Sequence, residues 1–134
     1  MLTRRGFAGC ALCAVAGFIA TGAEAQNTPA GFKRTILKQI DGPTEGYVTV
    51  NAVVEFEPGA IVPRHTHPGV ESSYLVEGAI ELAVDGEAPK KLLPGEAFQV
   101  PPNTIHSAKN GDKKSVLSAQ YIVEKGKPLA TPAP

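Results

Sequence analysis

The clearest pattern in the chain is the regular alternation of apolar side chains with mostly polar ones between residues 48 and 56. The regularly spaced apolar side chains are Val48, Val50, Ala52, Val54 and Phe56. Successive side chains of a strand point to opposite faces, so this alternation predicts a half-buried strand with one apolar face. Pro58-Gly59 then ends the strand.

Other short apolar stretches, each bounded by turn residues, predict further strands. They cover residues 33–40, 72–76, 80–84, 97–100 and 115–123. The turn signals include Asp41-Gly42-Pro43, Asp85-Gly86 and Pro94-Gly95. No stretch of the sequence has a sustained helical period. Short strands with a turn about every ten residues predict an all-β fold, an antiparallel sandwich or small barrel.

The first 25 residues are expected to be a cleavable signal peptide. Arg4 and Arg5 precede an uncharged stretch that ends in Ala23-Glu24-Ala25, the small-residue pattern of a cleavage site. Residues 3–7, Thr-Arg-Arg-Gly-Phe, resemble the twin-arginine export signal of bacteria, which implies a periplasmic protein. The alternatives are an ordinary secretory signal that carries two arginines and a lipoprotein signal with Cys10 as its cysteine.

The expected mature chain, residues 26–134, has 11 basic and 12 acidic residues and no cysteine. This composition excludes a disulfide framework and a thiol nucleophile. It has no basic stripe, which argues against a nucleic-acid partner. The apolar stretch of the signal is too short and weak for a confident membrane span, so no membrane association is expected after cleavage.

One domain is expected, because a chain of this length buries a single core. An N-terminal extension and edge strand (26–46) would lead into a barrel (47–124). A tail with three prolines (125–134) would follow, packed along the outside or free, since its prolines are expected to prevent it from continuing a sheet.

Candidate chemistry is concentrated in residues 59–78, which contain His65, His67 and Glu71. Residues two apart on an extended segment point to the same side, so both imidazoles can reach one point. Glu71 can join them because Pro68-Gly69 turns the chain in between. Two imidazoles and a carboxylate are typical of an open metal site that lacks a ligand. The third and last histidine, His106, follows a proline-rich turn downstream.

Two extended motifs resemble the signature motifs of the cupin superfamily, in the form of a small single-domain type-2-like cupin. The first is G-x5-H-x-H-x3-E-x6-G over residues 59–78, and the second is G-x5-P-x-N-x2-H-x3-N over residues 95–110. The second motif usually has glycine where this chain has Asn103. Asparagine tolerates positive φ, and Pro102-Asn103 suits the centre of a type II turn. The resemblance implies a jelly-roll-like cupin barrel and a metal site formed by His65, His67, Glu71 and His106.

One divalent transition metal is therefore the expected cofactor. Three imidazoles and a carboxylate leave one or two positions open on a metal that accepts five or six ligands. Manganese, iron, nickel, copper and zinc all tolerate such ligands. A twin-arginine substrate folds in the cytoplasm, where copper and zinc are tightly held, and this route favours manganese or iron over the copper that the Irving–Williams order prefers.

The expected function is metal-dependent catalysis on a small molecule. Dioxygenase-like oxidative cleavage of an enol or diketone-like compound is favoured, and isomerase or decarboxylase chemistry is also known on this fold. The alternative is a non-catalytic module that binds a metal or small ligand. No catalytic residue is assigned beyond the ligands, since Ser72 and Ser73 lack a free histidine to activate them. The resemblance also allows a homodimer formed through the sheets.

A few further side chains have two interpretations each. Arg64 is either a charge near the metal or substrate or a solvent-exposed residue. Four others either line the cavity or are ordinary strand residues: Tyr74, Gln99, Gln120 and Tyr121.

Overall fold

The computed structural model describes residues 28–134, and the predicted signal peptide lies outside them. Every regular element of this part of the chain is a strand. The strands are β1 (Phe32–Asp41), β2 (Tyr47–Phe56), β3 (Ile61–Thr66), β4 (Gly69–Glu77), β5 (Ile80–Val84), β6 (Lys90–Leu92), β7 (Ala97–Val100), β8 (His106–Asn110), β9 (Ser115–Glu124) and β10 (Thr131–Pro132). Within residues 28–134 there is accordingly no helix of the length and apolar character that a membrane crossing requires.

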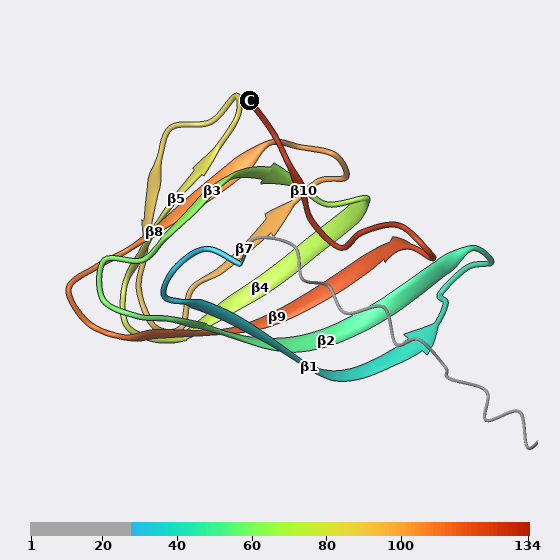
Figure 1. The fold of residues 1–134 in the computed structure, drawn as a ribbon, viewed down its shortest axis with the longest axis horizontal. Coiled ribbons are helices and arrows are strands. Elements are labelled where there is room, and N and C mark those ends of the chain that lie inside the picture. The colour runs from blue at the N-terminus through green and yellow to red at the C-terminus, as the bar shows by residue number, and fades with distance from the viewer. Residues whose placement is uncertain (1–27) are drawn as a thin grey trace, which may run out of the picture.

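The strands form two five-stranded antiparallel sheets that face each other (Figure 1). One sheet has the order β1-β2-β9-β4-β7 and the other the order β10-β3-β8-β5-β6. Apart from β1–β2 and β5–β6, consecutive strands lie in opposite sheets, as in a jelly roll. The predicted all-β, jelly-roll-like class is confirmed.

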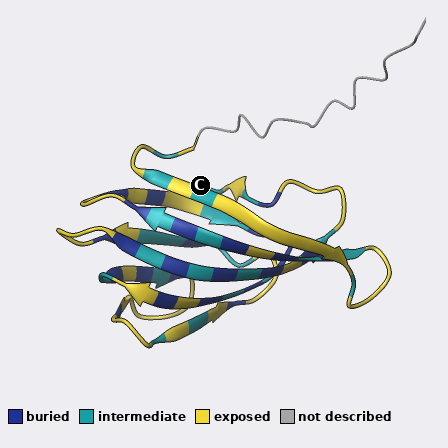
Figure 2. Ribbon diagram, turned by 90° about the horizontal axis from the view of Figure 1, so that it is seen from below, coloured by how far each residue is buried: buried dark blue, intermediate teal, exposed yellow. Residues whose placement is uncertain are grey.

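The core lies between the sheets and is built from alternate residues of each strand. All five apolar positions of the predicted face of β2 are at most 5% exposed. Figure 2 shows the same alternation as bands of buried and more exposed residues along the strands. Burial of each such valine, leucine or phenylalanine stabilises the fold by roughly 1.5–3 kcal/mol.

The C-terminal tail differs from the prediction, because its prolines do not keep it out of a sheet. Thr131 pairs with Thr66, and Pro132 pairs with His65. Strand β10 lies at the edge of its sheet. An edge strand tolerates proline, since the missing N–H can face away from the neighbouring strand. Leu129, just before β10, is buried in the core.

Asn110, the last residue of the second motif, has a structural role at the end of β8 away from His106. It is buried, and its Nδ2 donates to the carbonyl oxygens of Phe56 (3.2 Å), Glu57 (2.7 Å) and Lys113 (2.8 Å). Its Oδ1 accepts a hydrogen bond from Ser115 Oγ at 2.6 Å. One amide therefore fixes the end of β2 and the start of β9 against β8.

Candidate metal centre

A β-bulge in β3 turns His65 into the space between the sheets. Val62 is paired with Ala108, the register then shifts, and His65 is paired with His106. Val62 and His65 therefore both face inward although they are three positions apart, an odd spacing that a regular strand would place on opposite faces. An extra residue in one strand re-aims the side chains beyond it, and bulges are frequent beside functional sites. The bulge thus brings one histidine of each motif opposite the other.

Gly69 allows the sharp return from His67 to Glu71. His67 follows the end of β3, and β4 begins at Gly69. A Cβ atom on Gly69 would lie 2.0 Å from the carbonyl oxygen of Ile122 and 2.6 Å from Cα of Val123. Only glycine allows this close approach of two backbones. The tight start of β4 places Glu71 back beside His67.

The Pro102-Asn103 turn positions the second motif. Asn103 has a φ of 57°, and the Thr104 N–H donates to the Pro101 carbonyl oxygen at 3.3 Å. Both features match the predicted type II turn. The Asn103 N–H also donates to the His67 carbonyl oxygen at 2.9 Å. The turn therefore links the two motifs directly.

Substitutions at Asn103 test this turn. Asn103→Gly should be tolerated or slightly stabilising, because glycine adopts positive φ at little cost. Asn103→Val should lower the free energy of unfolding by about 1–2 kcal/mol, because a β-branched residue is strained there. Chemical denaturation of both variants measures the difference. Equal stability of the two variants would contradict the left-handed conformation.

The three imidazoles are oriented alike, each with its Nδ1 against a backbone carbonyl oxygen. The pairs are His65 with Pro63 (2.8 Å), His67 with Leu129 (2.5 Å) and His106 with Thr104 (3.0 Å). A carbonyl oxygen can only accept, so a neutral ring carries its proton on Nδ1 and keeps its lone pair on Nε2. Strand β3, the tail and the turn before β8 thus set the same tautomer in all three rings, as metal-binding histidines require.

The three histidines also converge. One ring nitrogen from each lies within 4.8 Å of the corresponding nitrogens of the other two. The ring centroid of His65 is 4.2 Å from that of His106 and 4.9 Å from that of His67. His67 and His106 are buried, and His65 is partly exposed. These three side chains can form a metal site.

Glu71 lies at the same point. Its Oε2 is 2.9 Å from Nε2 of His67 and 3.3 Å from Nε2 of His106, and its Oε1 accepts a hydrogen bond from Ser73 Oγ at 2.7 Å. Because the imidazoles carry their protons on Nδ1, their Nε2 atoms offer Glu71 Oε2 no hydrogen, and nitrogen lone pairs face a carboxylate oxygen there. One carboxylate oxygen is thus held by Ser73, and the other is directed at the histidines.

The donor atoms fit a metal ion better than they fit one another. Nε2 of His67 and Nε2 of His106 are buried and have no hydrogen-bond partner within residues 28–134. Their separations from Glu71 Oε2 are close to the roughly 3 Å between adjacent ligands that bond a metal at about 2.1 Å. Buried nitrogen lone pairs without partners are costly unless something binds them. A cation bound at this point would satisfy them.

His65 is also in the protonation state that a ligand needs. Burial and the neighbouring His106 lower the pKa of His65 to about 4, against an ordinary value of 6.5. The ring is therefore neutral at pH 7, and its Nε2 lone pair is available.

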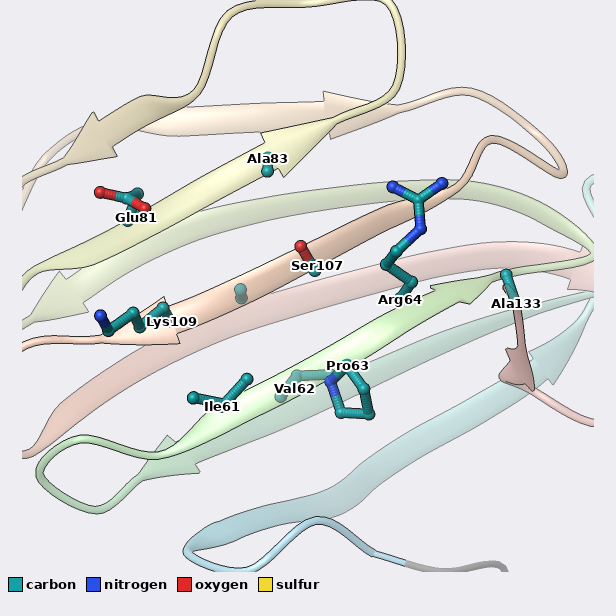
Figure 3. A pocket seen from close by; sticks show the side chains of 10 residues that line it. Ile61, Val62, Pro63, Arg64, Glu81, Ala83, Ser107, Lys109 and Ala133 are labelled. Atoms are coloured by element: carbon teal, nitrogen blue, oxygen red, sulfur yellow. The ribbon is translucent and has the colours of Figure 1, made fainter.

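Arg64 faces away from this site. Both of its terminal nitrogens donate to the Asp85 carboxylate at 2.8 Å, and its Nε donates to the Pro134 carbonyl oxygen at 2.5 Å. Figure 3 shows Arg64 at one end of a surface pocket, with Glu81 and Lys109 at the other end. The pocket lies over the outer face of β3, β8 and β5. Of the two interpretations of Arg64, the structure supports the exposed one.

Of the four candidates for lining the cavity, only Tyr121 is buried inside. Its ring centroid lies 5.0 Å from that of His67. Tyr74 is 45% exposed, Gln99 is exposed, and Gln120 donates to Ser118 Oγ across the outer face of β9.

Two residues beside the site have roles that the sequence did not indicate: Ser73, considered only as a nucleophile, and Arg34. Ser73 contacts Glu71 through its hydroxyl group, and the guanidinium carbon of Arg34 lies 5.3 Å from the Tyr121 ring centroid. The spacing of Ser73 from Glu71 on one strand face could have indicated the first contact. The register of β1, which brings Arg34 inward, has no signal in the sequence.

Comparison with known proteins supports the fold and the motifs. Germin-like protein subfamily 2 member 2 of Arabidopsis thaliana is 37% identical over 75 residues, which cover 51% of this chain and 34% of that protein. The chain thus spans about a third of the length of this curated relative. KdgF from Halomonas sp. superposes with a TM-score of 0.62 at 26% identity, covering 75% of this chain and 86% of KdgF.

A recombinant oxalate oxidase in complex with glycolate has a TM-score of 0.62 at 21% identity, covering 79% of this chain and 57% of the oxidase. At this identity the likeness extends to the fold alone. The family described as the cupin domain matches residues 52–128, a segment that contains all four candidate ligands. The chain belongs to the cupin domain family.

Proposed function

We propose that this cupin is exported to the periplasm, binds one divalent transition metal through His65, His67, His106 and Glu71, and catalyses a metal-dependent reaction on a small molecule. Oxidative cleavage of an enol or diketone-like compound is the favoured reaction. The proposal depends on one observation above the others. Three imidazoles, each tied back through Nδ1, direct their Nε2 atoms to one point, and two of these atoms are buried without a hydrogen-bond partner.

The donor set fits a first-row metal that accepts five or six ligands, and four protein ligands would leave room for a substrate. When bound, such a metal would supply Lewis-acid polarisation of substrate oxygens and, if iron or manganese, redox chemistry. Ser73 would hold Glu71 Oε1 so that Oε2 stays directed at the histidines. Burial raises the pKa of Tyr121, as does the Glu71 charge, so this hydroxyl stays protonated beside the site.

The second candidate function is a module that holds a metal or small ligand without turnover. The composition of the site favours it in one respect. Residues 28–134 have six buried polar side chains. Four of them belong to the candidate metal site or contact it: His67, His106, Glu71 and Ser73. The other two, Asn110 and Ser115, bind each other. No separate acid–base pair remains among them. A reaction would have to rely on the metal and on substrate orientation.

Oxygen uptake separates the two candidates. Protein loaded with manganese or iron would be screened against enols and 1,3-diketones in an oxygen-electrode cell. The enzyme proposal expects substrate-dependent oxygen consumption in the wild type and none in His106→Ala. Tight binding of a metal without oxygen consumption or any other turnover of these compounds would support the binding module instead.

The choice of manganese or iron depends on the export route. Arg4→Lys together with Arg5→Lys should leave the precursor in the cytoplasm, because both arginines are recognised as an address and not as mere charge. A general secretory signal would keep its basic start and still be exported. Fractionation and immunoblotting measure the outcome. Unchanged export of the double-lysine precursor would contradict the twin-arginine proposal and remove the reason for ranking manganese and iron first.

A further inference from the structure

Arg34 is a cation on the inner face of β1. It is paired with Val54 of β2, a buried core residue, so both side chains point between the sheets. Its guanidinium carbon lies 5.3 Å from the ring centroids of both Phe32 and Tyr121. The Tyr121 ring in turn lies 5.0 Å from that of His67. A single aromatic ring therefore separates the guanidinium from a candidate metal ligand.

The hydrogen-bonding capacity of Arg34 is not used up. Its Nε is buried without a hydrogen-bond partner, and no ion pair among residues 28–134 includes Arg34. Arg34 also hydrogen-bonds the Tyr121 hydroxyl. A guanidinium has five N–H donors, so this contact leaves others, Nε among them, for a ligand. A buried guanidinium nitrogen without a partner is costly, so an anion that pairs with this nitrogen would be stabilised.

Solvent reaches this part of the inner face. Ile36, the next residue along β1 on the same face as Arg34, is paired with buried Ala52 and yet is 46% exposed. Strand β1 is an edge strand, so the sheet ends beside it. A small solute could therefore approach Arg34 from the open edge without passing through the core.

We propose that Arg34 is a specificity residue that binds a carboxylate of the substrate while another part of the same molecule faces the histidines. The inference rests on the proposed function and narrows its substrate class to anionic enols or diketones. A guanidinium suits this task because its planar edge matches both oxygens of a carboxylate.

A matched pair of probes tests this assignment. 4,6-Dioxoheptanoate carries a 1,3-diketone and a separate carboxylate, and its methyl ester has the same diketone without the charge. Isothermal titration of full-length protein loaded with manganese would give both affinities. We expect the wild type to bind the acid about tenfold more tightly than the ester, and Arg34→Gln to bring this ratio close to one by weakening acid binding alone.

Two further variants make the test specific. Arg34→Lys keeps the charge but not the planar edge, so it should restore part of the preference for the acid. Lys33→Gln removes a neighbouring cation whose side chain is on the outer face, paired with Glu55 at 3.8 Å, and should keep the wild-type ratio. If Arg34→Gln does not fold, Arg34→Lys decides alone, and a ratio unchanged from wild type would overturn the inference.

Three other results would also overturn it. The first is a preference for the acid that persists in Arg34→Gln, and the second is equal weakening of both probes in that variant, as expected if Arg34 only packs on the rings. The third is no binding of either probe to the metal-loaded wild type. Failure of the proposed function is distinguishable from these results. It would appear as absent metal, or as charge-selective binding that depends on Arg34 without oxygen uptake or other turnover.

Discussion

His106→Ala should release the metal ion. His106 is 3% exposed, and its Nδ1 is held by the Thr104 carbonyl oxygen. Its Nε2 has no hydrogen-bond partner within the described part of the chain. A change in a residue that only supports a ligand weakens metal binding roughly 10–100-fold. Loss of a ligand itself should exceed that range. Competition titrations of manganese or cobalt against a chelator would measure the change, and His65→Ala and His67→Ala should behave alike.

Ser107→Ala is the matched control for this prediction. Ser107 is the next residue of β8 and lies on the outer face, beside the surface pocket in Figure 3. Its substitution should leave metal affinity within about twofold of wild type, as expected for a surface change. Stoichiometric metal retained by His106→Ala at wild-type affinity would remove His106 from the ligand set.

Gly69→Ala should destabilise the whole domain by at least about 3 kcal/mol. The added Cβ would lie 2.0 Å from a carbonyl oxygen of β9, and backbone atoms cannot rotate away as a side chain can. Relief would require β4 to separate from β9, the strand with which it has eight paired residues. Because Glu71 is two residues further on, the variant should also lose metal affinity. Thermal and denaturant unfolding of the metal-free protein measure the stability change alone.

Gly111→Ala provides the comparison. Its added Cβ would meet the Ala79 carbonyl oxygen at 3.3 Å, a contact that a small shift relieves. We expect a loss below about 1 kcal/mol, typical of a surface substitution. Similar losses for Gly69→Ala and Gly111→Ala would show that β4 and β9 do not approach as closely as described.

Local sequence patterns were enough to predict most of the fold. Alternation in β2 and the turns around β5 predict those strands to within a residue, because each strand has one buried face and a clear end. The short strands β3, β6, β8 and β10 were not predicted. They contain prolines, lysines or the metal-site histidines, and only their partners across the sheet make them strands.

The spacing of the two motifs was enough to predict that the site residues lie close together. It did not predict the contacts that hold them in place. The β3 bulge, the contact from Leu129 to His67 and the inward register of Arg34 all depend on segments that pair across long sequence distances. Arg64 illustrates the reverse case. It is adjacent to His65 in the sequence, but the pleat places it on the outer face, where it pairs with Asp85.

Elemental analysis of the protein purified from its native export route tests the central claim most directly. We predict about one equivalent of a transition metal per chain, with manganese or iron as the main element, and loss of that metal in His106→Ala prepared in the same way. Folded wild-type protein that contains no transition metal, and takes up none from manganese, iron or cobalt solutions, would contradict it.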